Sequence, residues 1–209
     1  MFAMASFTAI NHRRSVLYFT FAYLLGIFSY TLFLRNWEFQ FYVLIVFLVV
    51  LCIIRLNRLI RFSTIALWTM SLTGLMHLLG GLVHVPDSWP IIGTRHVLYN
   101  LWLIPGVLKY DNIIHFYGYA ICMWVIWQVC RAILPMKKTW LQIAIAVLAA
   151  NGVGACNEVI EFFAWRVLTE TNIGGYADTS WDLIYNFLGS VAAALAVRYG
   201  RPLRRSAKP

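Results

Sequence analysis

Charged residues are scarce in this chain. Only 12% of its 209 residues carry a charge, and 8 Asp and Glu stand against 17 Lys and Arg. A soluble domain is about a quarter charged, so the deficit excludes an ordinary cytosolic enzyme. Cysteine is also rare: the 4 cysteines lie in or beside apolar runs without Cys-x-x-Cys spacing. This pattern indicates small buried side chains and argues against a disulfide framework or a zinc site.

Familiar catalytic signatures are missing as well. The sequence has no P-loop, no Gly-x-Gly-x-x-Gly after a strand, no His-Glu-x-x-His and no nucleophile elbow. The net charge of +9 resides in short basic clusters between apolar runs, not in a continuous patch interleaved with aromatic residues. We therefore expect no nucleic-acid partner.

Apolar residues dominate what is present: 61% of the chain is hydrophobic and the mean hydropathy is +0.72. A membrane-spanning helix needs roughly 20 residues, so the length suits about six spans in one integral membrane domain, residues 1–209, with no separate soluble domain. Backbone groups in lipid must be satisfied within each segment, which predicts an all-α, polytopic membrane helix bundle. The expected spans are residues 15–34, 39–54, 63–83, 113–134, 140–168 and 180–197.

The basic residues predict the orientation of these spans. If the N-terminus is inside, every Lys and Arg falls on the cytoplasmic side except Arg35, Arg95, Lys109 and Arg166. The positive-inside rule then predicts that both termini are cytoplasmic. The acidic residues were not used in this argument, yet all of them fall outside or in the outer halves of spans.

The longest connection, residues 85–110, belongs to the outer face in this topology. Its apolar middle, residues 96–103, is too short to span. It forms either an interfacial or re-entrant helix that roofs a cavity, or a loop anchored by Trp89 and Trp102 at the lipid headgroups. The basic tail, residues 198–209, is expected to be disordered and to touch anionic lipid.

Polar residues recur at helical spacing on three of the expected spans. Residues three or four apart share one helix face, so each set forms a stripe. The topology brings the stripes together at the outer ends of their helices. The stripes are Asp111 and His115; Glu158 and Glu161; and Asp178, Asp182 and Asn186.

Several of these residues have a purely structural interpretation. Asp111 and Asp178 are suited to cap helix N-termini, and Asn186 to join two helices by a hydrogen bond. Glu158 and Glu161 are harder to explain, because a charge within a span is costly and two neighbouring carboxylates repel. They need a shared proton, a cation, or a basic partner such as His115 or Arg166.

These side chains favour a metal site or a protonatable cluster, and the spacing does not choose between them. In the first case a divalent ion activates water or polarises a phosphoryl oxygen. Glu158, Glu161, Asp182 and His115 are then the expected catalytic residues. Asn186 supports them. His77 and His84 share a face of the third span; we expect His77 to pack and His84 to be a weak candidate ligand. The candidate metal ligands are Asp111, His115, Glu158, Glu161, Asp178 and Asp182.

Several motifs resemble one family of bacterial membrane proteins. Met76-His77-Leu78-Leu79-Gly80-Gly81, Tyr110-Asp111-x3-His115-Phe116, Glu158-x2-Glu161 and Asp178-x3-Asp182-x3-Asn186-x2-Gly189 are similar to those of the uncharacterised YjdF-like proteins. The second half also resembles, more distantly, the VanZ-like proteins linked to glycopeptide tolerance, although Glu161 stands where a glutamine is expected. The resemblance implies a location in the bacterial inner membrane and supplies no activity.

Three functions stay open at this point. The chain is either an enzyme acting on a lipid-linked or cell-envelope substrate, or a non-catalytic protein that binds or transports a cation, a lipid or a small molecule. The third is a structural accessory subunit whose polar groups fix helix packing. Membrane lipid is the partner common to all three.

Overall fold

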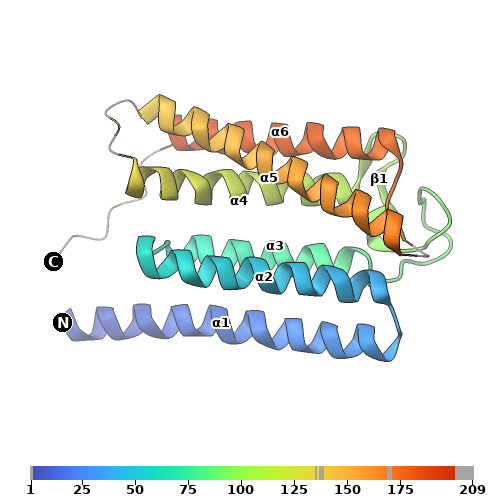
Figure 1. Cartoon of the computed structure of the whole chain (residues 1–209), viewed down its shortest axis with the longest axis horizontal. Helices are drawn as coiled ribbons and strands as arrows, with labels where there is room; N and C mark the ends of the chain where they lie inside the picture. Colours follow the sequence, from blue (N-terminus) through green and yellow to red (C-terminus); the bar gives the residue numbers. More distant parts are fainter. Residues whose placement is uncertain (1, 135, 137–138, 169–170, 201–209) are drawn as a thin grey trace.

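The computed structural model describes residues 2–134, 136, 139–168 and 171–200, and six helices make up most of them (Figure 1). The predicted all-α bundle is confirmed. Lys137, Lys138, Glu170 and the basic tail beyond Gly200 lie outside the described residues. The helices are α1 (Phe2–Phe33), α2 (Trp37–Ile60), α3 (Thr64–Gly80), α4 (Tyr110–Ile133), α5 (Thr139–Val167) and α6 (Tyr176–Tyr199).

Short polar turns reverse the chain between the first three helices. The Asn36 side chain accepts a hydrogen bond from the backbone N–H of Phe39 (3.1 Å) and caps α2. The Ser63 hydroxyl does the same for α3, accepting from Ala66 (3.2 Å). Such caps satisfy donors that the first helical turn leaves free. Consecutive helices therefore run antiparallel, and α1 begins at the same end of the bundle at which α6 ends (Figure 1).

Five helices are long and apolar enough to cross a membrane: the stretch Arg13–Phe33 of α1, and the whole of α2, α4, α5 and α6. Large apolar side chains on their outer faces are exposed, as expected of surfaces that contact lipid. The sixth helix, α3, has 17 residues and spans about 26 Å at 1.5 Å per residue. It is shorter than the predicted span of residues 63–83, because it ends at Gly80.

The bundle consists of two three-helix halves, α1–α3 and α4–α6 (Figure 1). Each half has its own core: Leu24, Tyr42 and Leu78 belong to the first, and Met123 and Ala146 to the second. A third apolar cluster joins the halves where Phe62 and Ala66, at the start of α3, pack against Val125 of α4. The main contact between the halves therefore runs along α3 and α4.

The connection from α3 to α4 lies at the opposite end from the start of α1. It contains a 3-10 turn, η1 (Leu98–Asn100), and two short antiparallel strands, β1 (Trp102–Ile104) and β2 (Leu108–Lys109). The alternative of an interfacial or re-entrant helix over residues 96–103 is therefore wrong. The strands turn at Gly106, whose φ of 71° suits a residue without a side chain.

Candidate functional site

The close approach of α4 and α6 creates the site. A Cβ atom at Gly189 of α6 would overlap the carbonyl oxygen of Phe116 on α4, so only glycine permits this contact. On α4, the neighbouring turns carry Asp111 and His115; on α6, Asp182 and Asn186 occupy the facing turns. Two of the three stripes predicted from the sequence thus meet side by side.

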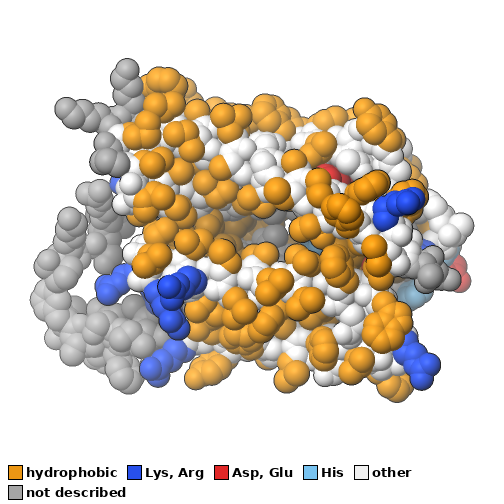
Figure 2. Space-filling view, viewed as in Figure 1, with side chains coloured by type: hydrophobic (Ala, Val, Ile, Leu, Met, Phe, Trp, Pro, Cys, Tyr) orange, Lys and Arg blue, Asp and Glu red, His pale blue; other side chains and the backbone are white. Residues whose placement is uncertain are grey.

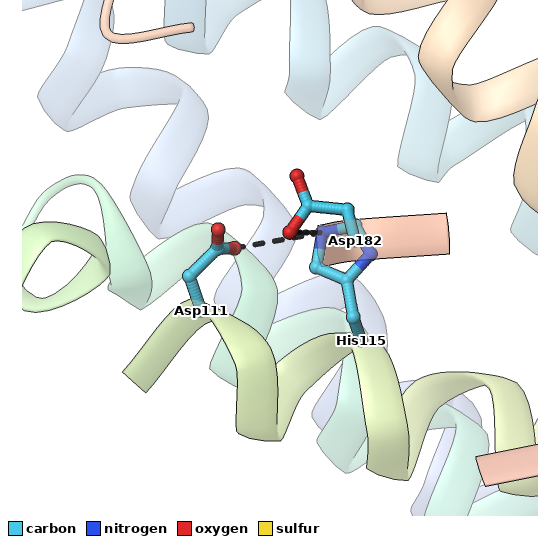
Figure 3. Close-up of side chains that lie close together, drawn as sticks. All are labelled: Asp111, His115 and Asp182. Carbon is cyan, nitrogen blue, oxygen red and sulfur yellow. Dashed lines mark ion pairs between the residues drawn. The ribbon is translucent and has the colours of Figure 1, made fainter. Parts of the chain in front are cut away.

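His115 stands at the centre of this cluster (Figure 3). Its Nδ1–H donates to Oδ1 of Asn186 (3.0 Å), an oxygen that can only accept. Its Nε2 lies 3.5 Å from Oδ1 of Asp111 and 3.8 Å from Oδ1 of Asp182. With Nδ1 bonded to Asn186, Nε2 is the ring nitrogen that faces the two carboxylates.

Asp182 is enclosed: 3% of its surface is exposed. Its Oδ1 has no hydrogen-bond partner among the residues that the structure describes. A buried carboxylate oxygen without a donor is costly, which indicates that a group other than these side chains satisfies it. Asp111, His115 and Asp182 each offer one ligand atom, and the three atoms lie within 4.8 Å of one another.

Lys109 supplies the positive charge of the cluster. Its ammonium group donates to Oδ2 of Asp111 (3.2 Å) and to Oδ1 of Asp178, and 6% of its side chain is exposed. Burial lowers the pKa of this amine, but the neighbouring Asp111 and Asp178 outweigh burial, so the net pKa lies above 10.5. Lys109 is therefore charged at neutral pH and fixes one oxygen of Asp111, leaving the other to face His115.

The Asp111–His115–Asp182 cluster opens into a cavity of about 50 Å³ between the two halves. At roughly 10–15 Å³ per water, this volume holds a few waters or an ion, not a whole organic substrate. Five acidic side chains line it: Glu38, Asp111, Glu161, Asp178 and Asp182.

The structure brings Glu161, but not every predicted residue, to this cavity. Glu161 lines it and accepts a hydrogen bond from Asn157 (2.8 Å), while Glu158 lies one turn away on α5, outside the lining. Arg166 is not their basic partner; its guanidinium stacks over Trp165 on the exposed side of α5. The buried cation of the cluster is Lys109, and it pairs with Asp111 and Asp178 instead of the two glutamates.

His77 packs against Tyr42 and Tyr99, as expected, but it also lines the cavity, whereas His84 does not. His77 lines the cavity, and Tyr99 holds it: the Tyr99 hydroxyl donates to the carbonyl oxygen of His77 (2.6 Å) and lies 2.6 Å from its Nδ1. Burial raises the pKa of Tyr99 well above 10.0, so the hydroxyl keeps its proton. Nδ1–H of His77 is then a donor, and Nε2 is left with its lone pair. The side chain of His84 is exposed, and its backbone pairs with Val97 outside the cavity.

Other residues around this cavity were not predicted from the sequence. Glu38 is buried at the start of α2 and lines the cavity, as do Tyr99, Asn100 and Asn172. Lys109 could have been predicted as part of the site because it lies two residues before Asp111. Glu38 could have been predicted because an acidic residue at the start of an apolar span is unusual unless it has a partner.

These features define an α-helical multi-pass membrane protein with a buried carboxylate–histidine cluster at one end of the bundle. The chain belongs to the family described as predicted membrane protein (DUF2238), whose model matches residues 13–201. No curated protein and no solved structure matches it.

Proposed function

We propose that Asp111, His115 and Asp182 bind a divalent metal ion, which holds and polarises an oxygen atom of a lipid-linked or cell-envelope substrate. The spacing around Nε2 of His115 carries this proposal, at 3.5 Å and 3.8 Å from the two carboxylates. Ligand atoms about 2.1 Å from a tetrahedral ion stand about 3.4 Å apart. Direct N–H···O bonds would be shorter, about 2.7–3.2 Å, so the two distances from Nε2 suit a shared ion better than hydrogen bonds.

The surrounding side chains support a metal ion rather than water alone. Metal-binding imidazoles commonly donate their second N–H to an oxygen, as His115 does to Asn186. Lys109 holds the outer oxygen of Asp111, which orients the inner one. Two carboxylates and one imidazole suit a borderline ion such as Mn²⁺, Fe²⁺ or Zn²⁺. Such an ion supplies a Lewis acid or an activated water, and Glu161, on the same cavity, is positioned to accept a proton.

Metal content tests the proposal directly. Protein purified without chelators is expected to contain about one divalent ion per chain by elemental analysis. Asp182→Asn and His115→Gln should lose the ion. Asp87→Asn removes the same charge from an exposed side chain at the same end of the bundle and should retain it. A wild-type protein that neither contains nor takes up Mn²⁺, Fe²⁺ or Zn²⁺, although it is folded, would overturn the metal site.

A second candidate is proton or cation binding without catalysis. The observation that favours it is the excess of carboxylates: five acidic side chains line the cavity, more than Lys109 and one divalent ion neutralise. Glu161 would then carry a proton. In this case vesicles containing the protein should show a proton or cation flux that Glu161→Gln abolishes and Asp87→Asn does not. Metal-dependent turnover without such flux would exclude it.

We also propose that the chain is one integral domain of the bacterial inner membrane with both termini cytoplasmic. Arg55 and Arg58 lie in the last turns of α2, Arg131 in the last turn of α4 and Arg198 in that of α6, all at the end where α1 begins. Figure 2 shows Lys and Arg side chains at this end. A YjdF-like assignment and a distant relation to VanZ-like proteins are supported by the paired Asp111 and His115.

A further inference from the structure

The cavity has two walls, and they belong to different halves of the bundle. Asp111, His115 and Asp182 form the wall from α4 and α6, and Tyr42 of α2 and His77 of α3 line the opposite side. The free Nε2 of His77 makes no hydrogen bond with any described residue, so it is available as an acceptor. A ligand between the walls would thus contact the proposed ion on one side and His77 on the other.

A short segment after α5 covers the cavity towards the loop end of the bundle. The backbone N–H of Asn172 donates to Oε1 of Glu38 (2.9 Å). The side-chain amides of Asn172 and Asn100 exchange two hydrogen bonds (3.0 Å and 3.1 Å). Ile173 and Gly174 continue this roof over the lining. These hydrogen bonds hold the segment against α2 and η1, and so narrow the approach from the aqueous side.

The side that faces the bilayer is open. Tyr42 is 9% exposed where α2 meets the cavity, whereas Val49, on the same face of α2 two turns further on, is 55% exposed. Among the residues that the structure describes, α1 and α3 pack around Tyr42, and this face of α2 is uncovered at Val49. Figure 2 shows a hollow between the halves on the face where α2 and α5 lie in Figure 1.

We infer that the substrate is a membrane lipid with a phosphate-bearing headgroup, which enters sideways through the gap between α2 and α5. The phosphate end of the headgroup reaches the cavity and an acyl chain lies along the gap beside Val49. The part of this inference that concerns the headgroup rests on the proposed function, in which a divalent ion is bound at the cluster. Lys109 is the one Lys or Arg in the described lining, against five carboxylic acids, so a divalent ion would supply the positive charge that binds a phosphate oxygen.

The size and chemistry of the cavity favour a lipid over a soluble ligand. A cavity of about 50 Å³ admits only the end of a larger molecule. The remainder of that molecule must lie in the space next to the cavity. On the roofed side that space is narrowed by the hydrogen-bonded Glu38, Asn100 and Asn172. On the other side it is a hollow in the apolar surface (Figure 2).

Photo-labelling in a defined bilayer tests the inference. The protein is placed in phosphatidylcholine nanodiscs that contain a small fraction of phosphatidylglycerol with a diazirine in its acyl chain, and labelled peptides are identified by mass spectrometry. Val49→Trp fills the gap and should reduce labelling of α2 and α5 about tenfold. Leu51→Trp is the matched control, because Leu51 is exposed on the opposite face of α2. It should leave the labelling of the gap unchanged.

Two further arms separate the lipid from other sources of phosphate. Unlabelled phosphatidylglycerol should compete with the probe, and glycerol 3-phosphate, which lacks the acyl chains, should not. A diacylglycerol with the same diazirine should label the gap weakly because it lacks the phosphate. Equal labelling of Val49→Trp and wild type overturns the lateral route, and equal labelling by diacylglycerol overturns the phosphate headgroup.

Metal content, measured on the same samples, distinguishes this inference from the proposed function. Val49→Trp should retain its metal and lose the lipid, and it thereby reports on the gap alone. A wild-type protein that labels specifically but contains no metal would refute the metal site while the lateral route stands. Labelling that is spread evenly around α2, in a protein that does contain metal, would refute the lateral route alone.

Discussion

His115 on α4 donates its Nδ1–H to Oδ1 of Asn186 on α6, across 3.0 Å of a fully buried contact. This single hydrogen bond determines which nitrogen of His115 faces Asp111 and Asp182. It also explains why a polar residue is tolerated at a position of α6 with no exposed surface. Asn186 therefore acts on the proposed ion through His115, as a positioning residue.

Replacing Asn186 with leucine should weaken metal binding about 10–100-fold, because the imidazole loses the acceptor that fixes its tautomer and orientation. The measurement is a metal titration of chelated protein. Asn151→Leu is the matched control: Asn151 also joins α5 to α6, through Ser190 (2.9 Å), but does not line the cavity. Equal metal affinity in wild type and Asn186→Leu would contradict the positioning role.

The close packing of α4 against α6 should depend on Gly189, because this position has no room for a side chain. Gly189→Ala places a methyl group against the Phe116 carbonyl, so we expect destabilisation of about 1–3 kcal/mol and loss of metal as the helices separate. Gly152→Ala is the control, because no atom lies within 4 Å of its added Cβ. It should be neutral or stabilising by up to about 1 kcal/mol. Thermal unfolding in detergent measures both, and similar melting temperatures would refute the tight contact.

Lys109 should make stability sensitive to alkaline pH. Its pKa is raised in the folded protein, since Asp111 and Asp178 outweigh burial. Its contribution is therefore fully present below the unfolded value of about 10.4 and is lost as the pH rises through the folded value. Lys109→Met should cost about 1.5–3 kcal/mol at pH 8, because it leaves the half-buried carboxylates of Asp111 and Asp178 without their cation.

The effect of Lys109 is isolated by comparing the free energies of unfolding of wild type and Lys109→Met at each pH. Tyrosines also ionise above pH 10, so the comparison is the free energy of unfolding of wild type minus that of Lys109→Met, measured from pH 8 to 11.5. The difference should be constant up to about pH 10 and then shrink. A difference that already falls between pH 8 and 9 would show that Lys109 is not held as a cation by these carboxylates.

The fold followed from the sequence because the apolar runs are long and the basic residues mark their ends. The carboxylate and histidine stripes of α4 and α6 were predictable for a related reason: spacing of three and four fixes a common face on a helix. Asp111, His115, Asp182 and Asn186 accordingly meet at one end of the bundle. Whether they bind metal stays a prediction.

The remaining residues of the site depend on contacts that spacing does not encode. His77 and His84 would share a face only if α3 continued to residue 84, but it ends at Gly80. There a Cβ at Gly80 would overlap the ring of Tyr99, and one at Gly81 would overlap the ring of Phe39. These ring contacts place Tyr99 on His77, and they join segments far apart in the chain, so a pattern along one helix could not reveal them.

The roof over the cavity gives the last prediction. Glu38 accepts from the backbone N–H of Asn172, and the amide pair with Asn100 holds the same residue in place. In Glu38→Ala the amide of Asn172 loses its acceptor, so its hydrogen exchange should accelerate, together with that of Ile173 and Gly174. Asp87→Ala, an exposed acidic position at the same end of the bundle, should leave this exchange unchanged. Asn100→Ala should lower the free energy of this local opening by a further amount of about 1 kcal/mol or less. If exchange of residues 171–174 is already fast in wild type, the roof is open in solution, and the aqueous side would then offer the substrate a second route.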